Sequence, residues 1–99
     1  MKTPYWTKHA KAKMRYYALS EQRVRRVLNS PSRVEGGIAE GTIALMQRVG
    51  SKKHPYEIWV MVKDEKARRK IISAWRYPGI THPGEPLPEE ILKEFREIF

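Results

Sequence analysis

Apolar residues near the start of the chain recur at the three- and four-residue spacing of amphipathic helices. One such stripe predicts a helix over residues 6–18; it consists of Trp6, Ala10, Met14 and Tyr17. A second helix is predicted over residues 21–29, because Ser20 is a good N-cap and three apolar residues follow on one face. The tight turn between the two ranges makes residues 1–31 a predicted helical hairpin.

The middle of the chain changes to the two-residue alternation of β-strands. Strands are predicted at residues 33–39, 42–49, 56–63 and 69–77. The first is weak because Gly36 and Gly37 interrupt it, and a tight turn at Glu40 and Gly41 separates it from the second. Short connections between successive strands predict an antiparallel sheet over residues 33–77.

The two central strands carry apolar residues on both of their faces. In residues 42–49, one face would present Ile43, Leu45 and Val49 and the other Ala44, Met46 and Arg48. In residues 56–63, one face would present Tyr56, Ile58, Val60 and Val62 and the other Glu57, Trp59, Met61 and Lys63. The N-terminal helices can cover one face, and the other needs cover from the last helix, a partner chain or a ligand.

The last part of the chain is predicted to be a loop followed by a helix. Residues 78–88 contain four prolines and two glycines, and residues 89–99 carry a wide apolar stripe at helical spacing. The order of elements predicts an α+β fold in which a helical hairpin packs on a three- or four-stranded antiparallel sheet, with a C-terminal helix. A length of 99 residues favours one domain over residues 1–99.

Positive charge is concentrated in two blocks of the sequence. The formal net charge is +9; residues 1–34 contribute +8 and residues 65–84 contribute +4. Basic faces of this kind most often bind polyanions such as nucleic acid, with a merely solubilising surface as the alternative. The chain has no cysteine, which excludes disulfides and a thiol nucleophile and fits a reducing, cytoplasmic setting. No apolar stretch has the length of a signal-peptide core or a membrane span.

The end of the last strand is a candidate site, because Arg76 stands between Trp75 and Tyr77 just before a proline and a glycine. An arginine can place two donors on a phosphate, and aromatic rings can stack on bases. The alternative is that both rings belong to the core while Arg76 extends to solvent. The other cations expected to contact nucleic acid are Lys13, Arg23, Arg26, Arg48 and Lys63.

RNA cleavage without a metal is the enzymatic reaction that best fits these residue types. The 2′-hydroxyl of the substrate attacks, a base removes its proton, cations stabilise the phosphate and an acid protonates the leaving oxygen. The candidate residues are His9, Glu57, Arg76, Tyr77 and His82. The histidines are scattered, so a structural or surface role is the alternative, and neither a metal site nor a cofactor motif is predicted.

Three motifs give the chain a resemblance to known families. W-T-K-H-A-x-x-K-M-R and L-S-E-x-x-V-x-x-V-L-x-x-P resemble a family of small uncharacterised bacterial and archaeal domains near the RelE/ParE-like toxins of the barnase–RelE fold. I-I-S-A-W-R-Y is similar to the last strand of BrnT-like and YoeB-like toxins. Together these matches span roughly residues 6–77.

The resemblance implies a helical hairpin on a twisted antiparallel sheet, an endoribonuclease activity and an antitoxin partner. Arg76 and Tyr77 match the Arg-Tyr ending of the toxin strand, and His9 matches the helix histidine of the uncharacterised family. Two positions depart from the toxins: Pro78 follows where they carry His-Tyr, and Glu57 stands in the region where they commonly carry an arginine.

Three functions are therefore predicted as alternatives. The first is an RNA-directed protein, an endoribonuclease toxin in its sharpest form, with RNA or the ribosome as partner. The second is a non-catalytic module of the same fold that binds nucleic acid or a ribosome. The third is a protein-interaction domain that uses the C-terminal helix, whose terminal residues Phe95, Ile98 and Phe99 are apolar. None of the three involves a membrane.

Overall fold

The computed structural model of the protein describes residues 2–38, 40–84 and 92–93. Among the described residues before position 85, a hydroxyl side chain caps the start of each of two helices. Helix α1 spans Lys8–Tyr16, and Thr7 Oγ1 accepts a hydrogen bond from the backbone N–H of Ala10. Helix α2 spans Glu21–Asn29, and Ser20 Oγ accepts from the N–H of Arg23. Such caps satisfy N–H groups that have no partner inside the helix. Both helices lie close to the ranges that the apolar spacing predicts.

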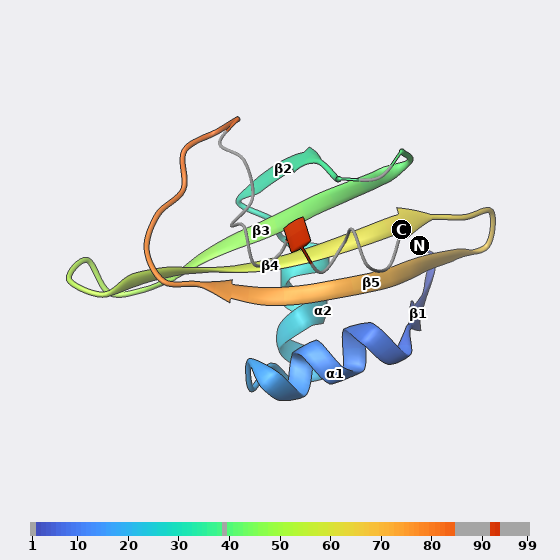
Figure 1. The fold of residues 1–99 in the computed structure, drawn as a ribbon, viewed down its shortest axis with the longest axis horizontal. Coiled ribbons are helices and arrows are strands. Elements are labelled where there is room, and N and C mark those ends of the chain that lie inside the picture. The colour runs from blue at the N-terminus through green and yellow to red at the C-terminus, as the bar shows by residue number, and fades with distance from the viewer. Residues whose placement is uncertain (1, 39, 85–91, 94–99) are drawn as a thin grey trace.

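Five strands form one sheet (Figure 1). They are β1 (Thr3–Trp6), β2 (Arg33–Gly36), β3 (Thr42–Gly50), β4 (Pro55–Asp64) and β5 (Arg68–Tyr77). Their order across the sheet is β1-β5-β4-β3-β2. Strand β1 runs parallel to β5, and the other three pairs are antiparallel.

The predicted fold class is wrong, because the sheet has five strands and is mixed instead of having three or four antiparallel strands. The missed strand is β1, which has only four residues, includes Pro4 and has no neighbour in sequence that pairs with it. Proline is tolerated there because β1 lies at the sheet edge. Both helices that the structure assigns lie near the N-terminus. The helix predicted over residues 89–99 lies outside the described residues, except for 92–93.

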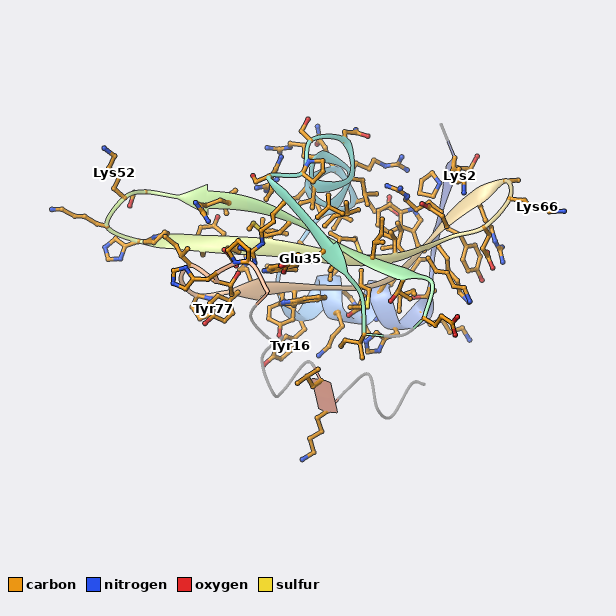
Figure 2. The ribbon with its side chains drawn as sticks, turned by 90° about the horizontal axis from the view of Figure 1, so that it is seen from above. Lys2, Tyr16, Glu35, Lys52, Lys66 and Tyr77 are labelled. Carbon is orange, nitrogen blue, oxygen red and sulfur yellow. The ribbon has the colours of Figure 1, made fainter. Side chains whose placement is uncertain are left out.

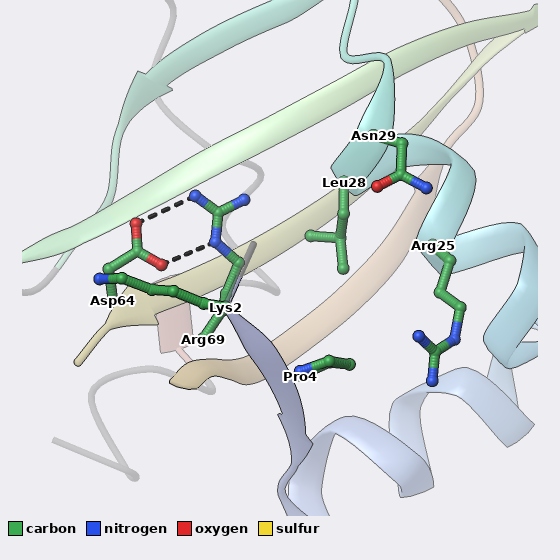
Figure 3. A pocket seen from close by; sticks show the side chains of 7 residues that line it. All are labelled: Lys2, Pro4, Arg25, Leu28, Asn29, Asp64 and Arg69. Carbon is green, nitrogen blue, oxygen red and sulfur yellow. Dashed lines mark hydrogen bonds and ion pairs between the residues drawn. The ribbon is translucent and has the colours of Figure 1, made fainter. Parts of the chain in front are cut away.

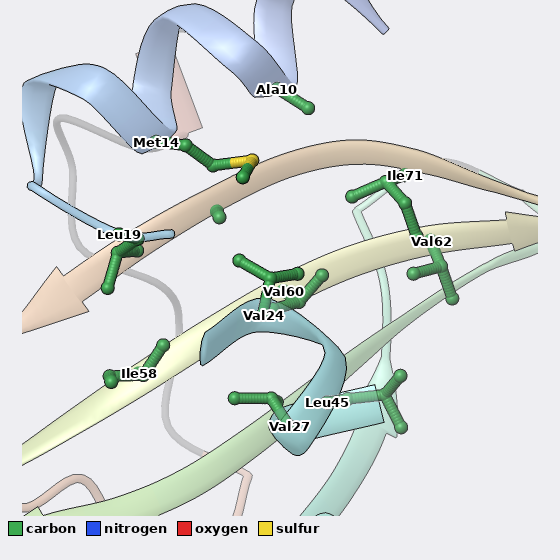
Figure 4. Close-up of a cluster of buried hydrophobic side chains, with 11 residues drawn as sticks. Ala10, Met14, Leu19, Val24, Val27, Leu45, Ile58, Val60, Val62 and Ile71 are labelled. Carbon is green, nitrogen blue, oxygen red and sulfur yellow. The ribbon is translucent and has the colours of Figure 1, made fainter. Parts of the chain in front are cut away.

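Both helices pack on one face of the sheet, where they form the larger hydrophobic cluster (Figure 4). Helix α1 lies against β5, and α2 lies against β4 and β3. The helices and the turn between them contribute Ala10, Met14, Leu19, Val24 and Val27. The strands contribute Leu45, Ile58, Val60, Val62, Ile71 and Ala74. This face will be called the helix face.

The opposite face of the sheet carries a second apolar cluster. Its buried members are Ala44, Met46, Trp59, Met61, Ile72 and Trp75. The rings of Trp59 and Trp75 stack with centroids 5.8 Å apart and an interplanar angle of 1°. The alternation predicted for the two central strands is confirmed, because their apolar residues divide between the two clusters as expected. This face will be called the tryptophan face.

The loop after β5 returns across the tryptophan face. Thr81 lies in this loop and hydrogen-bonds to Glu57 of β4 and to Arg33 of β2, whose guanidinium lies 5.1 Å from the ring centroid of Trp59. The loop therefore supplies part of the cover that this face needs. Within the described part of the chain, no helix is long and apolar enough to cross a membrane.

Candidate nucleic-acid interface

Arg76 leaves the end of β5 on the helix face and holds the turn between the two helices. Its Nε donates a hydrogen bond to the carbonyl of Tyr17 at 3.1 Å, and its Nη2 lies 3.4 Å from the carbonyl of Ala18. Ala18 has a left-handed backbone with φ of 55°, so the chain turns sharply there. The guanidinium also lies 5.1 Å from the ring centroid of Tyr56. These contacts fix the charge of Arg76 at one end of the sheet.

Arg23 of α2 is held at the same end of the molecule by Gln47 of β3. Its Nη1 donates to Gln47 Oε1 at 2.6 Å. The amide of Gln47 donates in turn to the carbonyl of Ser30 at 3.1 Å and to that of Arg26 at 3.3 Å. Residue 26 lies three positions after residue 23, so their side chains project from neighbouring positions on α2. Gln47 thus fixes both the C-terminal end of α2 and the guanidinium of Arg23.

The charge of Arg23 lies close to the charges of Arg26 and Arg76. The pKa of Arg23 is lowered, first by burial and then by the charges of Arg26 and Arg76, while Tyr56 acts in the opposite direction. Arginine stays protonated at any physiological pH, so the lowered pKa reflects the cost of burying this charge and, after that, its repulsion by two neighbouring cations. Within the described residues no carboxylate forms an ion pair with any of the three. We call these residues the arginine cluster; a bound phosphate would relieve its repulsion.

Trp75 does not belong to this surface. Its side chain is only 1% exposed and stacks on Trp59 inside the tryptophan face. A base could stack on that ring only after the core had opened. Tyr77 is half-buried and packs against the same cluster. Successive residues of a strand point to opposite faces, so Tyr77 and Arg76 lie on opposite sides of the sheet.

Glu57 lies in the interior of the tryptophan face and is 0% exposed. Its Oε1 accepts from Trp59 Nε1 at 3.0 Å and from Thr81 Oγ1 at 2.7 Å, and its Oε2 accepts from the Thr81 N–H at 3.0 Å. A general base must reach the proton that it removes. Glu57 is instead closed off by the loop that it anchors, on the face opposite to Arg76.

The remaining predicted residues are scattered over the molecule. His9 is the second residue of α1 and is half-buried, while His82 is exposed in the loop on the tryptophan face. Lys13 lies near the rings of the two tyrosines that end α1, at 5.1 and 5.7 Å from their centroids. Arg48 and Lys63 are exposed near opposite ends of the sheet. In the strand register, Arg48 of β3 lies opposite Glu57 of β4, and Lys63 of β4 lies opposite Lys70 of β5.

The five residues predicted for cleavage therefore do not surround one phosphate. Arg76 lies on the helix face, whereas Glu57 and Tyr77 lie on the tryptophan face. Among the described residues, no group of three or more histidines, cysteines, aspartates or glutamates could hold a metal ion. What the structure does bring together is the positive charge of Arg23, Arg26 and Arg76.

Sequence reasoning missed Gln47 and Tyr56, which position the arginine cluster, and it missed a basic pocket at the other end of the helix face (Figure 3). The alternation of β3 hides Gln47, because the residue takes an apolar position of the helix face.

Comparison of the chain with models of known protein families, with curated proteins and with solved structures finds no match.

Proposed function

We propose that this protein is an RNA-binding module that holds a single-stranded phosphate backbone on the helix face, through the arginine cluster. The observation that carries the proposal is the position of Arg23 beside Arg26 on α2 and near Arg76 of β5; burial lowers the pKa of Arg23, and the charges of Arg26 and Arg76 lower it further. Binding of a phosphate to such a site is favourable, because the negative charge offsets the repulsion between the arginines, charge-assisted hydrogen bonds form and counterions are released.

The overall charge supports a polyanionic partner. The chain has a formal net charge of +9, and nine of its cations fall within residues 1–34, which include both helices. Long-range attraction of this kind speeds association with nucleic acid, and local arginines then fix the register. RNA is proposed as the nucleic acid because of the toxin-like motifs, and the cytoplasm as the compartment because a cysteine-free chain fits it. The antitoxin partner implied by the same motifs stays a prediction.

Cleavage is not part of the proposal. Cleavage of a phosphodiester by general acid–base catalysis uses a base, an acid and a cation placed around one phosphate. Glu57 is fully buried and fully hydrogen-bonded, and Tyr77 lies on the other side of the sheet from Arg76. Binding alone requires no such convergence.

Fluorescence anisotropy with a labelled single-stranded RNA tests the proposal directly. Arg26→Gln is the sharpest variant, because the Arg26 side chain is exposed and makes no hydrogen bond or ion pair with any described residue. Loss of one phosphate contact should weaken binding about three- to tenfold and reduce the slope of log K against log salt by about 0.7. The thermal midpoint of unfolding should stay unchanged.

Lys66→Gln is the matched control, because it removes one positive charge from the exposed turn between β4 and β5. Lys66 lies toward the end of the molecule opposite to Tyr77 and Lys52 (Figure 2). Equal losses in the two variants would show that binding depends on diffuse charge and would contradict the cluster. Cleavage of the RNA by the unmodified protein, abolished by His9→Ala, would contradict a binding-only role.

A further inference from the structure

A pocket of about 460 Å³ opens on the helix face, between β1, α2 and the adjoining ends of β4 and β5 (Figure 3). Its size falls within the range of about 300–1,000 Å³ that is common for small-molecule sites. The charged side chains that line it are Lys2, Arg25, Asp64 and Arg69. Three cations thus face one carboxylate, which favours an anionic occupant.

The strand end fixes one of these cations in place. Arg69 Nε donates to Asp64 Oδ1 at 2.7 Å, and Arg69 Nη2 donates to Asp64 Oδ2 at 3.0 Å. The second terminal nitrogen, Nη1, takes no part in this fork. Hydrogen bonding from Arg69 lowers the pKa of Asp64, with a smaller contribution from the charge of Lys2. Asp64 is therefore ionised at neutral pH and orients Arg69 without filling the pocket.

The second arginine comes from the helix. Arg25 lies on α2, and its guanidinium is 5.5 Å from the ring centroid of Trp6, at the end of β1. Stacking on an aromatic ring restricts a guanidinium while it leaves the N–H groups at its edge free to donate. Arg25 forms no ion pair with a described residue, so its charge is available to a ligand.

The uncharged part of the lining suits a flat polar ring. Pro4 and Leu28 supply apolar surface, and Asn29 supplies one amide group that both donates and accepts hydrogen bonds. An inorganic anion would use only the cations. A ligand that carries a phosphate, a sugar and a base would use the cations, the apolar wall and the amide together.

We propose that this pocket binds a nucleoside monophosphate group through the cations that line it, Arg25, Arg69 and Lys2, with the base against Leu28. The same chemical group occurs in a free nucleotide and at the phosphorylated 5′ end of an RNA strand. The inference goes beyond backbone binding by the arginine cluster and does not depend on it, because the two sites share no residue. Residues 69 and 76 are seven positions apart along β5, which separates them by roughly 20 Å.

Calorimetric titration of the full chain with adenosine 5′-monophosphate, adenosine and inorganic phosphate tests the pocket. We expect the monophosphate to bind at least about tenfold more tightly than adenosine, because charge-assisted bonds to the phosphate are lost in the nucleoside. It should also bind more tightly than inorganic phosphate. Equal affinities for the monophosphate and either comparison compound, or absence of binding, would overturn the proposal.

Two neighbouring arginines of α2 provide a matched pair of variants. Arg25→Gln should weaken binding of the monophosphate about five- to tenfold, whereas Arg26→Gln should leave it unchanged. The reverse pattern is expected for the salt dependence of binding to an RNA with a 5′-hydroxyl, which lacks the phosphate that the pocket would bind, so failure of the pocket and failure of the arginine cluster can be told apart. If Arg25→Gln lowers the midpoint of thermal unfolding, Lys2→Gln replaces it as the test; unchanged affinity in both variants would contradict the site.

RNA oligomers with a 5′-phosphate or a 5′-hydroxyl identify the source of the group. Tighter binding of the phosphorylated oligomer, lost in Arg25→Gln, would assign the pocket to the end of an RNA strand. Equal binding of the two oligomers, together with tight binding of the monophosphate, would assign it to a free nucleotide.

Discussion

Thr81 ties the loop after β5 to the two strands β4 and β2. Its hydroxyl donates to Glu57 Oε1 at 2.7 Å and accepts from Arg33 Nη2 at 2.6 Å. Its backbone N–H donates to Glu57 Oε2 at 3.0 Å, and its carbonyl accepts from Arg33 Nη1 at 2.9 Å. A buried carboxylate and a guanidinium are therefore joined through one threonine. This arrangement gives Glu57 a structural role in place of the predicted catalytic one.

Removal of the Thr81 hydroxyl should destabilise the fold, because partners on Glu57 and Arg33 lose a buried hydrogen bond. We expect Thr81→Val to lower the free energy of unfolding by about 1–3 kcal/mol. Thr81→Ser keeps the hydroxyl and should cost clearly less. Urea unfolding monitored by tryptophan fluorescence measures both, and equal losses in Val and Ser would show that the hydroxyl is not what matters.

Ser73 leads to the opposite expectation. Its side chain is 1% exposed, and its Oγ has no hydrogen-bond partner among the described residues. A buried hydroxyl without a partner costs free energy, so Ser73→Ala should leave stability unchanged or raise it by up to about 1 kcal/mol. The midpoint of urea unfolding gives the answer. A loss of stability larger than about 1 kcal/mol, as for a broken buried bond, would contradict the geometry.

At the scale of the elements, the junction between β1 and α1 depends on Thr7. Its Oγ1 accepts from the Ala10 N–H at 3.0 Å and donates to the carbonyl of Ile71 in β5 at 2.9 Å. The same atom thus caps a helix and fastens that helix to the sheet. Ser20, by comparison, caps α2 through the Arg23 N–H alone.

The difference between these caps can be measured. Ser20→Ala should cost about 1 kcal/mol, the usual value of a lost N-cap. Thr7→Val is nearly isosteric and removes both the cap and the bond to β5, so it should cost about 1 kcal/mol more than Ser20→Ala. Denaturant unfolding of the two variants under the same conditions checks the order. Equal costs would mean that the bond to Ile71 contributes nothing.

Local patterns predicted the elements that are defined by their own sequence and missed those defined by distant partners. The alternation of β3 and β4 and the stripes of both helices are visible in the chain itself. Strand β1 is not, because its partner residues, Arg68–Ile71, follow it by 65 positions in the sequence. Likewise, no local sequence pattern predicts the hydrogen bond between Thr81 and Glu57, which are 24 residues apart.

At the scale of the whole molecule, the sheet divides the candidate residues between its two faces. Arg76 and Tyr77 were predicted to form one site because they are neighbours in sequence. In a strand, however, successive side chains point to opposite faces of the sheet, and these two do so. Arg23 and Arg26 were predicted to contact nucleic acid, and the fold brings the charge of Arg23 close to those of Arg26 and Arg76. Composition therefore suggested the partner class, while only the fold could assign residues to one surface.

The acid limit of stability depends on carboxylates that are paired in the fold, and Asp64 is the clearest of them. The hydrogen bonds from Arg69 hold its pKa below the usual value of about 3.9. A carboxylate with a lowered folded pKa stabilises the protein fully above its unfolded pKa, and this contribution disappears as pH falls through the folded pKa. The matching shift of Arg69 is a raised pKa, so its contribution persists throughout the neutral range.

Asp64→Asn should therefore reduce stability at pH 7, and the loss should become smaller at a pH of about 2.5, below the usual pKa of an aspartate. The side chain of Asp64 is 34% exposed, so solvent screening keeps the expected loss to at most about 1 kcal/mol. Glu40→Gln is the control, because Glu40 is an exposed carboxylate without an ion pair to a described residue. Thermal unfolding at the two pH values measures the effect. An equal loss of stability at both pH values would show that Asp64 acts through packing, because a contribution from its charge must become smaller as the carboxylate is protonated.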